Sequence, residues 1–279
     1  MKRKKNRRLL KIILFCLGIG ICSYPIISNV VSQMYLNHTI ATYQKQVESC
    51  DDSNLEEILE DAQEYNQILF QSKESVLHPS QANILNSESY YRILNLFGNG
   101  IMGSIEIPKI GVNLPIYHGT SDEVLSVAVG HIEGTSLPIG GKNTRTVLSG
   151  HRGLPNSKLF TRLDELIIGD FFFIRVLNQT LAYEVLDIEV IHPDDVDKLE
   201  LIPDQDLVTL LTCTPYGLNT HRLIVTGARV PYIEKEYNEI EEEMMSYREL
   251  IFMSIPFVFI ILGITNAVKK KIRKKRGIK

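Results

Sequence analysis

One cysteine of the chain lies where a nucleophile could be presented, at the end of an apolar strand. Residues 207–213 form an apolar run that ends in Cys213, residues 214–217 read as a turn, and Arg222 opens the next apolar run. This spacing can place a thiol and a guanidinium on adjacent strands. Far upstream, His151 also follows the end of an apolar run. A cysteine with a distant histidine is the pattern of a thiol nucleophile, so catalysis at Cys213 is one interpretation of these residues.

The alternative interpretation of Cys213 is a small buried hydrophobic side chain, which is the more frequent role of a free cysteine. The chain has 7 His, so spacing alone does not select a partner for the thiol. Cys16 and Cys22 lie in an apolar run near the start of the chain, and Cys50 stands in a polar region. The sequence has no C-x-x-C spacing and no disulfide framework, and we expect neither a metal nor a cofactor.

Charge is strongly segregated along the chain, although the formal net charge is only -3. Residues 1–11 carry seven Lys or Arg, residues 269–279 carry eight, and neither tail has an acidic residue. The rest of the chain therefore holds 15 basic against 33 acidic residues. An acidic middle cannot neutralise phosphates, so we expect no nucleic-acid partner.

Each basic tail adjoins an uncharged apolar run that is long enough to cross a membrane. Residues 12–31 and 250–268 contain no charge, and about 20 apolar residues span the hydrocarbon core as a helix. Because Lys and Arg clusters stay on the cytoplasmic side, we expect two transmembrane helices, cytoplasmic termini and an extracytoplasmic middle. The alternatives are a cleaved signal peptide for the first run and a buried core helix for the second.

The chain between the two runs reads as a helix followed by many short strands. Apolar residues recur at helical spacing from Leu55 to Leu69, and Ser53 with Glu56 fits a capping box. A polar segment, about 71–89, follows this helix. From Ile101 onward, short apolar runs alternate with Gly and Pro turns, which predicts a barrel or a sandwich.

Several sequence blocks resemble the sortases, the membrane-anchored cysteine transpeptidases of Gram-positive bacteria. Residues 209–213 read Thr-Leu-Leu-Thr-Cys, and with Arg222 they are similar to the TLxTC…R signature of that family. Further blocks are similar to class C, the pilus-building branch, and they lie at 102–110, 114–120, 130–138, 149–155 and 213–217. The resemblance extends from about Tyr65 to Tyr232, and a second C-terminal anchor is also typical of class C.

The resemblance implies a mainly β fold, a closed eight-stranded antiparallel barrel with helices added before it. It also implies three catalytic residues. Cys213 would attack the carbonyl of a substrate threonine as a thiolate, which nearby cations favour. His151 would protonate the leaving amine and deprotonate the incoming one. Arg222 would bind the substrate carbonyl or its oxyanion.

Other candidates near these residues receive lesser roles. We expect His118 and His131 to shape loops, and His221 to point to the opposite strand face from Arg222. Arg152 is the second choice for a contact with an anion. One departure from class C concerns its lid, which usually carries Asp-Pro-aromatic and pairs the Asp with the catalytic arginine. Residues 78–80 read His-Pro-Ser here, so we expect freer access to Cys213 than in lidded relatives.

The resemblance predicts an enzyme that cuts LPXTG-type sorting signals of pilin subunits and joins them to a lysine of another pilin. The alternatives are the same chemistry on a peptidoglycan precursor, and a non-catalytic pilus assembly factor that only binds sorting signals. The expected partners are pilins and membrane lipid. The expected divisions are tails at 1–11 and 269–279, spans at 12–31 and 250–268, a helical region at 32–100 with a lid-like part at 71–89, a barrel at 101–232 and a linker at 233–249.

Overall fold

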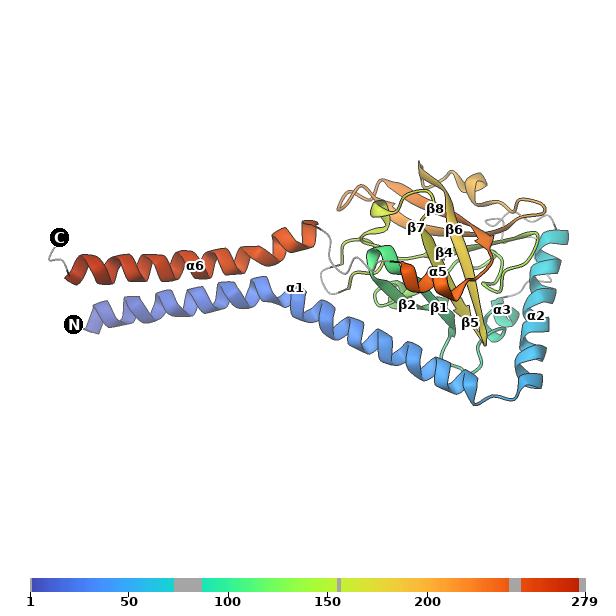
Figure 1. Cartoon of the computed structure of the whole chain (residues 1–279), viewed down its shortest axis with the longest axis horizontal. Helices are drawn as coiled ribbons and strands as arrows, with labels where there is room; N and C mark the ends of the chain where they lie inside the picture. Colours follow the sequence, from blue (N-terminus) through green and yellow to red (C-terminus); the bar gives the residue numbers. More distant parts are fainter. Residues whose placement is uncertain (1, 73–86, 155–156, 241–246, 276–279) are drawn as a thin grey trace. The chain divides into compact units, whose positions relative to one another are not determined.

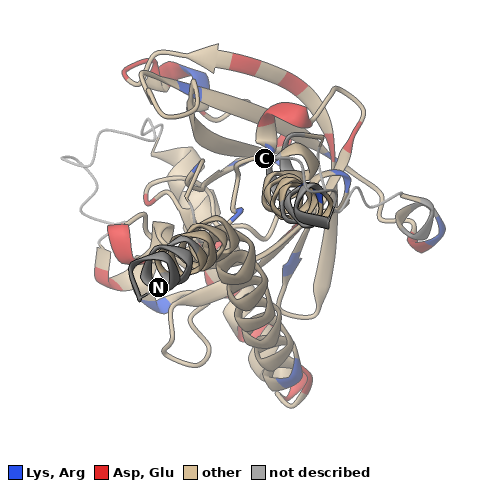
Figure 2. Cartoon of the chain, turned by 90° about the vertical axis from the view of Figure 1, so that its left-hand side faces the viewer, with Lys and Arg blue, Asp and Glu red and all other residues tan. Residues whose placement is uncertain are grey.

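The structure is a computed structural model that describes residues 2–72, 87–154, 157–240 and 247–275. The chain forms two compact units. One comprises Met1–Val30 with Met245–Lys279, and the other comprises Val31–Met244. Figure 2 shows acidic and basic residues interspersed on the loops and strands of the larger unit.

The larger unit is built on a closed eight-stranded barrel, as predicted (Figure 1). Its strands follow the order β1-β2-β3-β4-β7-β8-β6-β5 around the barrel. Their bounds are β1 Ile101–Ile107, β2 Val112–His118, β3 Val129–His131, β4 Thr144–Ser149, β5 Phe171–Val176, β6 Gln179–Ile191, β7 Asp206–Thr214 and β8 His221–Val230.

The expectation of a wholly antiparallel barrel is wrong, because the sheet is mixed. The pairs β2–β3 and β4–β7 are parallel, and the other neighbours are antiparallel. A parallel pair requires a crossover connection. The β2–β3 crossover contains the short helix α4 (Asp122–Leu125), and the β4–β7 crossover contains β5 and β6. The chain thus inserts a hairpin of two strands between two strands that lie side by side.

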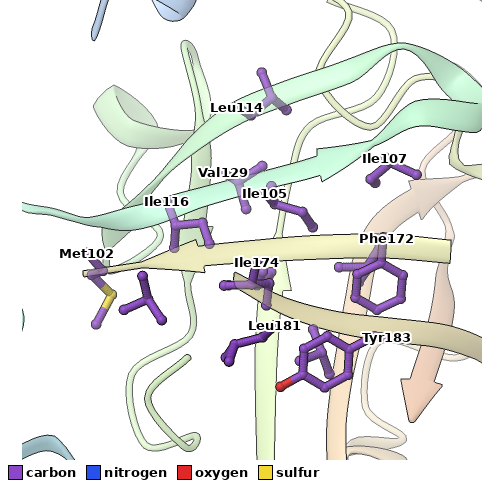
Figure 3. Packing of buried hydrophobic residues seen from close by; sticks show 14 of the residues in the cluster. Met102, Ile105, Ile107, Leu114, Ile116, Val129, Phe172, Ile174, Leu181 and Tyr183 are labelled. Carbon is purple, nitrogen blue, oxygen red and sulfur yellow. The ribbon is translucent and has the colours of Figure 1, made fainter. Parts of the chain in front are cut away.

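Alternate residues of the strands fill the barrel interior. Ile105, Ile116 and Ile174 are fully buried there, and Phe172 stacks on Tyr183 with ring centroids 5.5 Å apart (Figure 3). Gly227 of β8 makes room for this pair, because a Cβ atom at that position would lie 2.4 Å from Cε1 of Phe172. A glycine inside a strand often marks such a close approach.

The helices before the barrel also pack on it. Helix α1 (Lys2–Glu48) buries Leu36, Ile40, Tyr43 and Val47 at helical spacing, and Tyr43 Oη donates a hydrogen bond to Met102 O at 3.0 Å. Helix α2 (Asp52–Gln71) follows, and α3 (Ser87–Arg92) precedes β1. In α2, the Asn66 amide binds both backbone groups of Leu137, at 2.7 and 3.2 Å.

Helix α1 continues to Glu48, within the region 32–100 that was expected to be helical. Two local predictions need correction. Helix α2 begins at Asp52 with Asp51 as N-cap residue and no side-chain cap bond, so the predicted capping box from Ser53 is wrong. Strand β3 was not predicted, since its three residues are too few to show a hydrophobic period.

The expected second membrane span is not confirmed. Among the described residues, α1 from Ile12 onward is the one helix long and apolar enough to cross a membrane. Helix α6 (Tyr247–Lys275) contains the shorter apolar stretch Ser254–Asn266. Within the smaller unit the two helices meet, since a Cβ atom on Gly263 would lie 3.6 Å from the Phe15 ring.

The chain leaves the barrel through helix α5 (Glu234–Glu239), which is bound to the outside of β1 and β5. Tyr237 Oη donates to a carboxylate oxygen of Glu106 at 2.6 Å, and Arg175 pairs with the same carboxylate at 3.0 Å. Burial and this carboxylate raise the pKa of Tyr237 to about 12. The tyrosine therefore remains a hydrogen-bond donor at physiological pH.

The close approach at Gly227 gives a stability prediction. Replacing Gly227 with Ala should lower the free energy of unfolding by about 1–3 kcal/mol, because the new methyl group overpacks the Phe172 ring. Chemical denaturation measures the change. In a Phe172→Leu background the same replacement should lose less stability. Equal losses in both backgrounds would show that the Phe172 contact is not the cause.

Candidate active site

Two of the three predicted catalytic residues lie directly opposite each other in the sheet. Cys213 of β7 pairs in register with Arg222 of β8. Residues opposite each other in an antiparallel pair send their side chains to the same face, with Cβ atoms about 4.5–5.5 Å apart. Both side chains lie on the outer face of the barrel, because Leu210 and Val225 of the same strands point into the main core.

The parallel pair β4–β7 brings the third predicted residue to the same level. The register pairs Ser149 with Leu211 and continues beyond β4, where Gly150 N donates to Leu211 O at 3.1 Å. The Thr212 hydroxyl donates to Gly150 O at 2.7 Å. His151 follows Gly150 as Cys213 follows Thr212, so the histidine stands level with the cysteine on the neighbouring strand.

The segment after His151 is fixed by packing on both sides. Phe160 N donates to His151 O at 3.1 Å, and a Cβ atom on Gly150 would lie 2.7 Å from the Phe160 ring. Gly153 has a φ of +81° and touches the ring of Tyr216, which belongs to the β7–β8 turn. The turns that follow β4 and β7 therefore hold each other in place.

Arg152, the second choice for an anion contact, supports the same turn. Its side chain is 5% exposed and pairs with Asp164 at 2.7 Å. Its Nη1 also donates to the Thr214 hydroxyl at 3.1 Å, one step beyond the level of Cys213. Both terminal nitrogens are bound to these internal partners, so Arg152 positions the strand ends and does not offer them to a substrate anion. The buried Nε has no hydrogen-bond partner among the described residues.

Arg222 keeps most of its donors for a ligand. One of its terminal nitrogens donates to the backbone oxygens of Asn219 and His221, at 3.3 and 3.1 Å. No carboxylate of the described residues forms an ion pair with it. The predicted lid, with its sequence His-Pro-Ser at 78–80, lies outside the described residues.

His131 and His118 have structural roles, as expected from their positions in loop-forming segments. His131 is fully buried, and its ring nitrogens bind Tyr90 Oη at 2.9 Å and Ser136 O at 2.9 Å. Burial lowers its pKa to about 4, so it stays neutral at physiological pH. Both ring nitrogens of buried His118 lie within 3.0 Å of backbone oxygens, of Gly100 and Ile93. His221 is exposed and contacts the Thr220 hydroxyl.

Sequence reasoning missed the apolar surface beside the three residues. Leu211 and Ile224 share the outer face with Cys213 and Arg222, and they form a small cluster with Val147, Ile191, Leu199 and Ile132. Leu211 and Ile132 are only partly buried. The signal was present in β7, whose run shows no polar alternation. A strand without alternation is covered on both faces.

A buried arginine lies near this apolar cluster and binds the segment that contains Leu199. Arg145 of β4 donates to the Thr209 hydroxyl at 3.0 Å and to Glu200 O at 2.9 Å, which ties the β6–β7 connection to the barrel. Burial lowers its pKa, and the nearby Asp187 and Glu189 act in the opposite direction. Among the described residues, no group of three or more His, Cys, Asp or Glu could hold a metal ion.

Comparison with known proteins agrees with this geometry. The sortase domain family matches residues 105–230. The crystal structure of sortase C1 from Streptococcus agalactiae has a TM-score of 0.66 and 44% identity, covering 70% of this chain and 100% of that one. The chain belongs to the sortase family. Its enzyme type is accordingly the sortase-type cysteine transpeptidase, and its solved neighbours are of class C.

Two further relatives bear on the site. The structure of Clostridium perfringens sortase C with the C-terminal cell wall sorting motif has a TM-score of 0.59 and 43% identity, covering 70% of this chain and 99% of that one. Sortase D of Bacillus subtilis is 34% identical over 131 residues, which are 46% of this chain. The match spans 63% of the length of sortase D.

The Thr212 hydrogen bond gives a prediction about positioning. Thr212→Val keeps the side-chain shape and removes the bond to Gly150 O, so it should lower stability by about 1 kcal/mol. Because the bond sets the level of His151, acylation of Cys213 should slow roughly ten- to a hundredfold. Thr212→Ser retains the hydroxyl and should stay near the wild-type rate. A full rate in the valine variant would contradict the proposed positioning.

The neutral state of His131 gives a pH prediction. Its pKa lies below the usual 6.5 in the folded chain, so only the unfolded chain gains the proton as the pH falls through this range. The contribution of neutral His131 to the free energy of unfolding is complete above pH 6.5. It should be lost, by up to ~3 kcal/mol, as the pH falls towards 4. Denaturation series across this range measure the loss. His131→Asn should have a flatter profile, and identical slopes would rule out His131 as the source.

Proposed function

We propose that this protein is a membrane-anchored transpeptidase that cleaves LPXTG-type sorting signals of pilins between Thr and Gly. It then joins the new carboxyl end to a lysine of another pilin. The observation that carries the proposal is the register that pairs Cys213 with Arg222 and, continued past Ser149 by two hydrogen bonds of Gly150, brings the backbone of His151 level with Cys213. These three residues supply a nucleophile, an anion-binding group and a proton carrier.

The chemistry follows from these positions. The Cys213 thiolate attacks the threonine carbonyl, and the negative charge that develops on its oxygen is stabilised by the free donors of Arg222. His151 protonates the glycine amine as the peptide bond breaks, which leaves a thioester on Cys213. The neutral imidazole then accepts a proton from the incoming lysine amine. That amine attacks the thioester, forms an amide and releases the thiolate.

The apolar surface supports the choice of substrate. Leu211 and Ile132, the partly buried members of this cluster, are suited to contact the Leu and Pro side chains of a sorting signal, and Leu211 shares the outer face with Cys213. The solved structure of Clostridium perfringens sortase C contains the C-terminal cell wall sorting motif, which supports a sorting signal as the substrate here. The class C identity of the solved neighbours favours a pilin lysine as acceptor over a peptidoglycan precursor.

The apolar helices support a membrane location. Helix α1 serves as the anchor in this proposal, since it is long and apolar enough to span the bilayer from Ile12. We also propose α6 as a second span, because its apolar stretch Ser254–Asn266 is followed by the eight cations of 269–279. Cations beside both helices then keep both termini cytoplasmic and the barrel outside.

Replacement of the proposed nucleophile tests the function. Cys213→Ala should abolish both cleavage and transfer, because it removes the thiol that forms the thioester in this mechanism. Cys50→Ala is the matched control, since Cys50 is also a partly buried thiol, with a hydrogen bond only to Gln46 O. The full chain is incubated with candidate pilins, and ladders on a denaturing gel report polymerisation.

Mass spectrometry of the product then identifies the acceptor. A lysine isopeptide between two pilins supports polymerisation, whereas a bond to a peptidoglycan precursor would support the anchoring alternative. Turnover by Cys213→Ala above a few per cent of wild type would contradict the nucleophile. A lack of turnover in both variants and in the wild type, with intact binding of sorting signals, would point to the non-catalytic assembly factor.

A further inference from the structure

Two adjacent isoleucines project from the barrel at the turn before β5. Ile167 is 60% exposed and Ile168 is 66% exposed. Leu186, which is 54% exposed, lies next to this turn at a β-bulge of β6, where Val185 O accepts a hydrogen bond from Gly169 N at 2.9 Å. Single exposed apolar residues are ordinary, but turns favour polar residues, so a group of three large aliphatic side chains requires an explanation.

The backbone fixes the direction in which the isoleucines project. Asp170 N donates to Ile167 O at 3.1 Å, and Gly169 has a φ of +93°, so Ile168 occupies the corner of a tight turn. The Asp170 carboxylate accepts from Ile167 N at 2.8 Å. Leu166 before the turn and Phe172 after it are buried. The exposure of Ile167 and Ile168 is therefore built into a constrained turn.

This turn lies at the same end of the barrel as the start of β2, which is contacted by Gln33 of α1. Lys109, in the β1–β2 connection, pairs with Asp170 at 3.9 Å, and Arg162 donates to Ile110 O in the same connection at 3.1 Å. At the start of β2, Asn113 O accepts from the Gln33 side chain of α1 at 3.2 Å. Gln33 comes two residues after the uncharged run 12–31, a rise of about 3 Å along a helix.

The charges around the turn are compatible with a lipid surface. Asp170 pairs with Lys109, Glu165 with Arg162 at 2.9 Å, and Asp164 with Arg152 at 2.7 Å. Each acid of residues 164–170 therefore has a basic partner. The Glu184 carboxylate of β6, which also approaches Gly169, has no ion pair among the described residues. On α1, Met34 and Tyr35 are also exposed, directly after the apolar run. Tyrosine is enriched at the membrane–water interface.

We propose that the turn formed by Ile167, Ile168 and Gly169, together with Leu186, inserts into the headgroup region of the outer leaflet of the membrane. It acts as a second contact that orients the barrel on its anchor. The inference rests on the proposed membrane location. His151 and the two isoleucines belong to the same connection after β4, so this contact would hold the catalytic residues at a set height above the lipid.

The absence of tryptophan from the sequence makes a direct test possible. Ile168→Trp gives the full chain a single indole at the turn. Ile202→Trp is the matched control, because Ile202 is also exposed but lies by the starts of β4 and β7, away from the strand ends that carry His151 and Cys213. Each variant is inserted into phosphatidylcholine vesicles with or without bromine on the acyl chains, and tryptophan emission is compared.

We expect bromine to lower the emission of Ile168→Trp about twofold or more, since interfacial side chains lie about 5–10 Å into the headgroup and acyl boundary. Emission of Ile202→Trp should be unchanged. Flotation first verifies that each chain is bound to the vesicles, and thermal unfolding verifies that each variant is folded. A chain that does not float contradicts the membrane location itself. A floating, folded Ile168→Trp variant without quenching overturns the contact and leaves the isoleucines to a protein partner.

Discussion

The parallel pairing of β4 with β7 is the constraint on which the candidate site depends. These strands are joined by a crossover that contains two other strands of the barrel, and their pairing sets His151 level with Cys213. Two hydrogen bonds continue the register beyond the end of β4, from Gly150 N to Leu211 O and from the Thr212 hydroxyl to Gly150 O. A slip by one residue would send the histidine side chain to the other face of the sheet.

The surroundings of this pair serve the same geometry. The turns after β4 and β7 hold each other through Gly153 and Tyr216, and buried Arg152 joins both through Thr214 and Asp164. On the outer face, Arg145 ties the β6–β7 connection to the barrel at Glu200, next to Leu199, which is a buried member of the apolar cluster. The candidate site therefore lies on the sheet, and in the proposed function the substrate contacts come from partly buried Leu211 and the free donors of Arg222.

Sequence reasoning succeeded where the signal is local. The spacing of Cys213 and Arg222 across one short turn predicts neighbouring strands, and the structure pairs them. His151 was identified through a family resemblance, because nothing local in the sequence encodes a parallel register across such a long crossover. The same limit explains the wrong expectation of a wholly antiparallel barrel. Strand β3 has too few residues to show a hydrophobic period. Asp51 and Ser53 are equally good N-cap residues by type, so the start of α2 could not be fixed from the sequence. The outer apolar face was missed although the uninterrupted run of β7 indicated it.

The most direct test of the account measures the proximity of positions 151 and 213. In a His151→Cys variant, a bifunctional thiol reagent that fluoresces only after both of its arms react should link the new thiol to Cys213. Peptide mapping of the full chain would identify the link. Ile202→Cys serves as the control, because Ile202 is exposed on the same crossover but lies by the starts of β4 and β7, at the other end of these strands. We expect rapid linkage for His151→Cys and little for Ile202→Cys. Equal linkage in both variants, or none at position 151 in a folded chain, would contradict the parallel register that assembles the site.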